Sequence, residues 1–170
     1  MAKKLRMKDL NGLNELYKVT ERVWLVEEEL YVDVRQMIRP SEIDTMLGEM
    51  LAVVNKAQEL ELDDMLDPHF IDDVMMCFMI KHFTTTEFPE KMHQMEVEDV
   101  LSALKEMIDT DYYEKIAKAF PQTETEKIYE RMLDRYKQLA VASRTATLIE
   151  KAFKEMPIAN DEIKKLMTNV

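Results

Sequence analysis

The segment DPHFIDDVMMCFMIKHFTTTEFP, residues 67–89, decides the fold because most of it can form one apolar helix. Asp67 can cap this helix, and Pro68 suits its first position. The helix dipole favours acids in the first turns and cations in the last turn, where the segment supplies Asp72, Asp73, Lys81 and His82. Residues 74–83 are apolar on most sides, so the sequence predicts a helix at the centre of the core.

The same helix also gathers side chains that bind soft metals, namely Met75, Met76, Cys77, Met79 and His82. Two ligands of one ion on a helix need a spacing of three or four residues. Cys77 and His82 are five residues apart, and the residue four positions after Cys77 is Lys81. A buried cysteine behaves as a small hydrophobe, and methionine fills irregular core gaps. The spacing therefore favours a packed core helix over a metal site.

The segment RVWLVEEELYVDVRQM, residues 22–37, is rich in β-branched and aromatic residues. Apolar and other side chains alternate along its second half, with Leu30, Val32 and Val34 set against Tyr31, Asp33 and Arg35. We predict a β-hairpin that turns at about Glu28 and Glu29. The turn lacks an Asn-Gly type of signal, so a helix over 22–36 stays open as the alternative.

Helical spacing dominates the chain after this hairpin. Ser41 with Asp44 resembles a capping box before an amphipathic helix over about 42–58. A second apolar stripe comprises Val97, Val100, Leu101, Leu104, Met107 and Ile108. A short helix in TDYYEKIAKAF, residues 110–120, is expected to end at Pro121.

The C-terminal part of the sequence predicts a long helix. Thr123 with Glu126 can cap it, and its apolar positions reach Phe153. The small and polar stretch AVASRTAT, residues 140–147, is a point where this helix can bend. Pro157 ends the helix, and Asn160 can cap a last short one.

These elements predict a mainly α fold, a helical bundle-like single domain over residues 1–170. The hairpin belongs to an N-terminal segment, 1–39, and the helical body covers 40–170. The chain length suits one domain, and the sequence has no repeat of fixed period and no obvious linker.

Composition excludes several classes of function. Two glycines in the whole chain argue against phosphate-binding loops. The net charge of -11 repels phosphate backbones, so nucleic acid is not an expected ligand. The single cysteine excludes an internal disulfide, and no run of about 20 apolar residues suggests a membrane helix. We expect a soluble protein without a cleaved leader, located in the cytoplasm.

Motifs for catalysis or metal binding are weak. Glu90 and His93 form one Glu-x-x-His pair, but the second copy that di-iron bundles need is missing. The acidic stretch from Glu59 to Asp73 lacks the glycine at the turn of a calcium loop, and its acids do not follow the alternating spacing of the oxygen ligands in such a loop. No serine has a histidine nearby, and the apolar neighbours of Cys77 raise its pKa and shield it. We therefore expect neither an enzyme nor a cofactor or metal.

A surface for protein partners is the remaining candidate site. Methionine is flexible and polarizable, so the chain's fifteen methionines can line a groove that adapts to an apolar helix. An acidic rim would favour a basic or amphipathic partner. The alternative is that all the methionines fill the core. We assign partner binding to Tyr112, Tyr113, Phe120, Met132 and Tyr136.

The order of these parts resembles a known family, the tail assembly chaperones of long-tailed phages (siphophages) of Gram-positive hosts. The resemblance lies in VWLVEEELYVDV (23–34), MIRPSEIDTML (37–47), FIDDVMMCFMIKHF (70–83), FTTTEFP (83–89) and MIDTDYYEKIAKAFP (107–121). The resemblance lies in the order of the parts over most of the chain, and no diagnostic motif accompanies it.

This resemblance implies a non-enzymatic role in the host cell cytoplasm. Such chaperones coat the tape measure protein and are then displaced by tail tube subunits, so both are the implied partners, and self-association stays open. A frameshifted longer form, encoded around Lys164 and Lys165, is also typical of the family. Two alternatives are a structural virion component of the head-tail connector type and an acidic inhibitor of a host enzyme.

Overall fold

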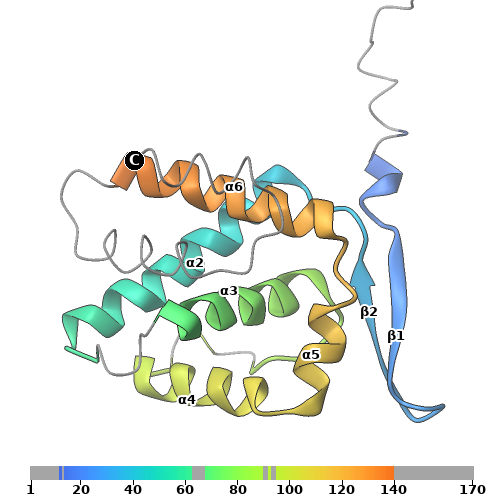
Figure 1. Ribbon diagram of the computed structural model, residues 1–170, viewed down its shortest axis with the longest axis horizontal. Coiled ribbons are helices and arrows are strands. Elements are labelled where there is room, and N and C mark those ends of the chain that lie inside the picture. The colour runs from blue at the N-terminus through green and yellow to red at the C-terminus, as the bar shows by residue number, and fades with distance from the viewer. Residues whose placement is uncertain (1–11, 13, 63–67, 90–91, 93–94, 140–170) are drawn as a thin grey trace, which may run out of the picture.

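The computed structural model describes residues 12, 14–62, 68–89, 92 and 95–139. The described part is mainly helical, with one small antiparallel sheet near its N-terminal end (Figure 1). Its elements are β1 (Thr20–Val26), β2 (Leu30–Arg35), α2 (Pro40–Glu59), α3 (Pro68–Phe83), α4 (Val97–Ile108), α5 (Asp111–Ala117) and α6 (Gln122–Leu139). The expected fold class is confirmed.

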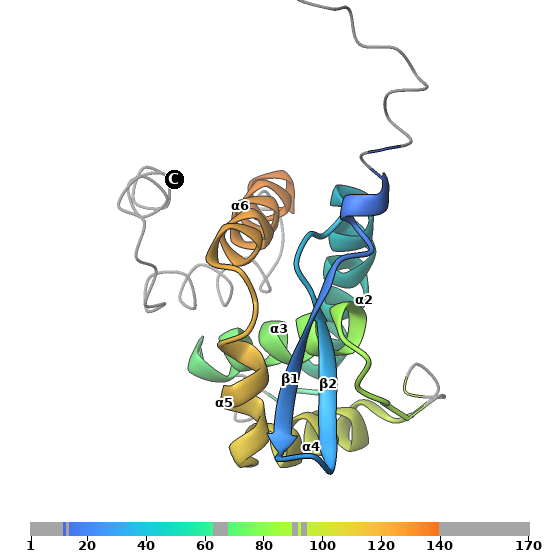
Figure 2. The same cartoon turned by 90° about the vertical axis from the view of Figure 1, so that its right-hand side faces the viewer.

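Strands β1 and β2 form the predicted hairpin rather than a helix (Figure 2). Their register runs from Thr20 opposite Arg35 to Trp24 opposite Tyr31, and a bulge precedes the turn. Glu28 has a φ of 60°, a left-handed conformation that a tight turn can require. The alternation along β2 places two valines, at 32 and 34, in the core.

Helix α3 occupies the middle of the molecule, as its apolar sequence predicts. Figure 1 shows α2 and α6 on one side of it, α4 on the other, and α5 with the hairpin at one end. Eight of its side chains lie in the core, namely Ile71, Val74, Met75, Cys77, Phe78, Met79, Ile80 and Phe83. The methionines here fill the core, where their flexibility suits irregular gaps.

Two carboxylates near the start of α3 hold neighbouring helices. Asp73 accepts a hydrogen bond of 2.7 Å from the Tyr113 hydroxyl on α5, and Asp72 accepts one of 2.7 Å from Tyr129 on α6. Burial, together with these carboxylates, raises the pKa of both tyrosines. Both acids follow the first turn of α3, which itself contains no acidic residue. They serve as anchors between helices.

The predicted cap of α2 at Ser41 is wrong. Pro40 occupies the first helical position and Arg39 is the N-cap, with extended backbone angles of -72° and 138°. The carboxylate of Glu42 accepts the Arg39 backbone N–H at 3.3 Å and a hydrogen bond from Arg35 at 2.8 Å. An acidic side chain three residues after the N-cap thus satisfies a free backbone donor, without help from Ser41.

Helix α6 begins at Gln122, so Thr123 lies inside the helix instead of capping it. The following residue, Glu124, is buried and accepts the Ile38 backbone N–H at 2.8 Å. Lys127 donates to Glu124 at 2.6 Å and to the Ile38 carbonyl at 2.8 Å. This ion pair therefore satisfies both backbone groups of a buried residue between β2 and α2.

Several expectations fall outside the described residues. They concern the cap at Asp67, the pair Glu90 and His93, and the whole chain after Leu139, which includes the bend at 140–147 and the lysines at 164 and 165.

A glycine in the interior of α2 gives a test of the packing between α2 and α6. A Cβ atom added at Gly48 would lie 3.7 Å from Nη1 of Arg135, which is an ordinary contact. Gly48→Ala should therefore raise the free energy of unfolding by about 0.5–1 kcal/mol, since alanine has the higher helix propensity. Urea denaturation followed by circular dichroism measures this, and a loss of stability would show that the helices pack more tightly than described.

The thiol of Cys77 tests the burial of α3. Its side chain is fully buried against α4, with Sγ 3.9 Å from the carbonyl oxygen of Leu104. Burial, and secondarily the Asp73 carboxylate, raises the pKa of Cys77 to about 12. Iodoacetamide at about pH 8 should leave the native thiol unmodified, because the thiolate is the nucleophile. The urea-denatured chain is the control and should react fully. Rapid modification of the native protein would contradict a core position.

Candidate functional site

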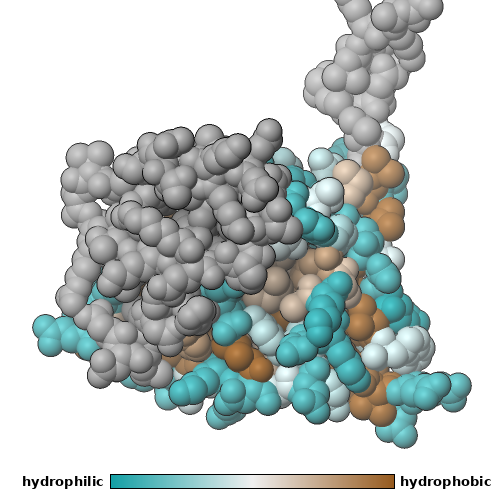
Figure 3. Space-filling model, in the orientation of Figure 1, coloured by the Kyte–Doolittle hydropathy of each residue, from teal (hydrophilic) through white to brown (hydrophobic). Residues whose placement is uncertain are grey.

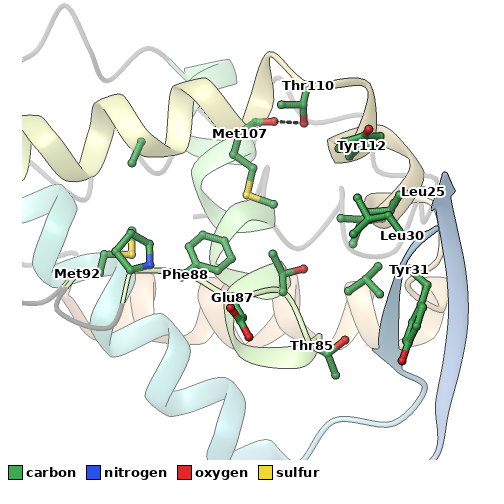
Figure 4. A pocket seen from close by; sticks show the side chains of 15 residues that line it. Leu25, Leu30, Tyr31, Thr85, Glu87, Phe88, Met92, Met107, Thr110 and Tyr112 are labelled. Atoms are coloured by element: carbon green, nitrogen blue, oxygen red, sulfur yellow. Dashed lines mark hydrogen bonds between the residues drawn. The ribbon is translucent and has the colours of Figure 1, made fainter.

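An apolar groove opens beside the tip of the hairpin, where three parts of the chain meet (Figure 4). Its volume is about 590 Å³. The hairpin, the segment after α3, α4 and α5 all contribute to its lining, which comprises Leu25, Leu30, Tyr31, Val32, Thr85, Thr86, Glu87, Phe88, Pro89, Met92, Ala103, Met107, Thr110, Tyr112 and Ile116. Most of these side chains are apolar, so the groove suits a nonpolar occupant.

The hairpin forms one wall of the groove. Figure 4 shows Leu25 of β1 and Leu30 of β2 side by side near Tyr112. Leu30 is 44% exposed, and Tyr31 beside it is 45% exposed. The Tyr31 ring is held from the hairpin side by an edge contact with Trp24, at a centroid distance of 5.3 Å, and by the Arg22 guanidinium, 3.8 Å from the ring centroid. These contacts keep an exposed aromatic ring in a fixed place.

The threonine run after α3 positions a second wall. Thr84 donates to the Ile80 carbonyl at 2.7 Å and so closes the helix end. Thr85 exchanges two hydrogen bonds with Asp33 of β2: its hydroxyl accepts the Asp33 N–H at 2.9 Å, and its own N–H donates to the Asp33 carbonyl at 3.1 Å. The segment is thus tied to the outer edge of the hairpin, which places Phe88 and Pro89 along the groove.

Helices α4 and α5 form the third wall at the point where the chain turns between them. Met107 extends from α4 into the middle of the groove (Figure 4). Thr110 caps α5 by accepting the Tyr113 N–H, and it donates to the Met107 carbonyl at 2.7 Å. This cap fixes the direction of α5, so that Tyr112 faces outward beside Leu30 and is 37% exposed.

The structure separates the five residues that the sequence assigns to partner binding. Tyr112 lines the groove. Tyr113 is half-buried and bonded to Asp73, while Phe120 and Met132 lie in the core with 6% and 1% exposure. Neither Phe120 nor Met132 therefore offers a surface in this fold. The side chain of Tyr136 lies outside the described residues.

Sequence reasoning missed most of the groove. Leu25, Leu30, Phe88 and Met107 come from three separate parts of the chain, and no spacing connects them. The available signal was Leu30, whose place in the alternation of β2 predicted an inward side chain. At the hairpin tip that inward direction leads into the groove rather than into the core.

Another polar cluster joins α2 and α3 away from the groove. Glu49 of α2 contacts Lys81, and its other oxygen lies 2.5 Å from Nε2 of His82. Burial acts to raise the pKa of the Glu49 carboxyl, but the hydrogen bonds from Lys81 and His82 outweigh it and hold that pKa below its ordinary value. The ionised carboxylate therefore stabilises the contact between the two helices at pH values above the ordinary pKa, and this contribution is lost as pH falls through the lowered pKa.

Metal-binding side chains do not gather in the part of the chain that the structure describes, where no group of three or more histidine, cysteine, aspartate or glutamate side chains could hold an ion. Cys77 faces α4 and His82 faces Glu49 of α2. The two side chains that the sequence brings together on α3 thus have different partners.

The surface on the hairpin side carries hydrophobic residues among hydrophilic ones (Figure 3). In the described part, no helix is both long and apolar enough to cross a membrane.

No curated protein and no solved structure shows significant similarity to the chain. A family model described as YomO, which represents phage-type proteins like those of the SPbeta prophage, matches residues 7–169. The chain therefore belongs to the YomO family of phage-type proteins.

Proposed function

We propose that this phage-type protein is a non-enzymatic tail assembly chaperone, which binds the tape measure protein and later yields it to tail tube subunits. The observation that supports this proposal most is the apolar groove of about 590 Å³ beside the hairpin tip. An apolar helix that must be kept from aggregating needs such a surface, and helix-in-groove binding is a common way to provide it.

The chemistry of the groove supports binding rather than catalysis. Its described lining holds one carboxylate, that of Glu87, and no histidine, cysteine, lysine or arginine. The hydroxyl of Thr110 is engaged in capping α5. A nucleophile needs an adjacent base within hydrogen-bond reach, and the described lining supplies no such pair.

The flexibility of the lining supports a partner that is bound and then released. Met92 and Met107 contribute unbranched side chains to the groove, and Leu30 and Tyr112 remain partly exposed. Methionine adapts to different apolar shapes at little cost. A groove of this kind can hold successive apolar turns of a long helical protein, each with modest affinity.

Co-expression with the tape measure protein of the same phage tests this proposal. We expect a soluble complex that co-elutes in size-exclusion chromatography. Leu30→Gln should weaken binding roughly fivefold, because it removes part of one apolar contact in the groove. Leu60→Gln is the matched control, since Leu60 is 46% exposed, close to the 44% of Leu30, but lies at the end of α2 outside the groove.

Two results would contradict the proposal. One is an insoluble tape measure protein with no complex. The other is the presence of this protein at fixed stoichiometry in purified phage particles, which would favour a structural virion component.

A further inference from the structure

Part of the backbone edge beside the groove is already occupied. On the outer side of β2, Asp33 exchanges two hydrogen bonds with Thr85, and Val34 forms a bridge with Thr84. A partner in extended conformation would need free N–H and C=O groups on this edge to add a strand. Because the groups of Asp33 are taken, strand addition is blocked at this position, which favours an occupant that satisfies its own backbone. An α-helix does so within itself.

The rim of the groove is acidic. Glu27, Glu28 and Glu29 are exposed in the turn between Leu25 and Leu30, which both line the groove.

Three further carboxylates belong to the lining or lie next to a lining residue in the chain. Glu87 belongs to the lining, and Asp109 and Asp111 flank Thr110. Within the described part of the chain, none of these six carboxylates forms an ion pair. Lys115 of α5 donates to the Leu25 carbonyl at 3.0 Å. The rim therefore presents negative charge to whatever enters the groove.

We infer that the occupant of the groove is an amphipathic helix whose apolar face is flanked by lysine or arginine side chains. This inference rests on the proposed function and specifies the segment of the partner that is bound. The apolar face fills the space around Met107, and the flanking cations reach the carboxylates at 27–29 and at Glu87. Opposite charges at such a rim raise the association rate and select the partner.

Three synthetic helical peptides of about 18 residues, about five turns, test this inference with the full-length protein. All share one leucine-rich face, and their flanking positions carry lysine, glutamine or glutamate. Fluorescence anisotropy at about 50 mM salt should show the lysine peptide binding about tenfold more tightly than the glutamine peptide, with the glutamate peptide weakest. At about 500 mM salt the three affinities should converge, because exposed charges are then screened.

Two triple variants with the same net charge distinguish an effect of the rim carboxylates from an effect of the protein's overall charge. Glu27→Gln, Glu29→Gln and Glu87→Gln together should reduce the preference for lysine to about twofold. The control combines Glu59→Gln, Glu98→Gln and Glu130→Gln, which are exposed on α2, α4 and α6 away from the groove, and should retain the preference. Circular dichroism confirms that both variants are folded.

Equal affinities for the lysine and glutamine peptides, no binding of the lysine peptide, or an equal effect of the two triple variants would overturn this inference. The proposed function is judged separately by co-expression. A tape measure complex whose affinity for the protein does not depend on salt or on the rim glutamates would leave the chaperone role standing and remove the charge selectivity.

Discussion

Helix α3 has no wide polar face, and the need to cover it on all sides organises the rest of the structure. Its buried residues include Phe78, Met79 and Ile80, and α2, α4, α5 and β2 all contact it. Its two partly buried carboxylates, Asp72 and Asp73, meet tyrosine hydroxyls from α6 and α5. Hydrophobic burial thus brings the elements together, and these two hydrogen bonds fix how the later helices dock, because unpaired buried carboxylates are costly.

The groove results from the way in which the hairpin and α5 pack around helix α3. The chain leaves α3 through a threonine run that bonds to the outer edge of β2, while Lys115 of α5 bonds to the carbonyl of Leu25 near the hairpin tip. The hairpin therefore stands against the helices without filling the corner between them. Apolar side chains such as Met107 face that corner, and water or a partner occupies it. The acidic turn of the hairpin then lies beside an apolar surface.

Local patterns were sufficient to predict the hairpin, the core helix and the apolar stripe of α4, because alternation and helical spacing report directly on burial. Two helix caps were mispredicted, since Ser41 and Thr123 fit a cap by spacing. Glu42 instead satisfies the backbone N–H of Arg39, three residues before it, and Glu124 reaches the backbone N–H of Ile38, which only the folded chain brings near. The groove joins the hairpin to the segment after α3 and to α4 and α5, which all lie far from it in the chain, and single-sequence patterns carry no information on such contacts. For the same reason Met132, an apolar residue on an amphipathic helix, was assigned to a partner-binding surface, whereas the structure places it in the core.

The central claim is that partners dock in the groove beside the hairpin tip. Amide hydrogen exchange followed by mass spectrometry, with and without the tape measure protein, tests it most directly, because exchange reports local protection along the whole chain. Docking in the groove should slow exchange at the hairpin tip, residues 24–31, and around the turn between α4 and α5, residues 107–113, with little change in the middle of α2. Protection confined to α2 and α6, with unchanged exchange at the hairpin tip, would show that partners dock elsewhere.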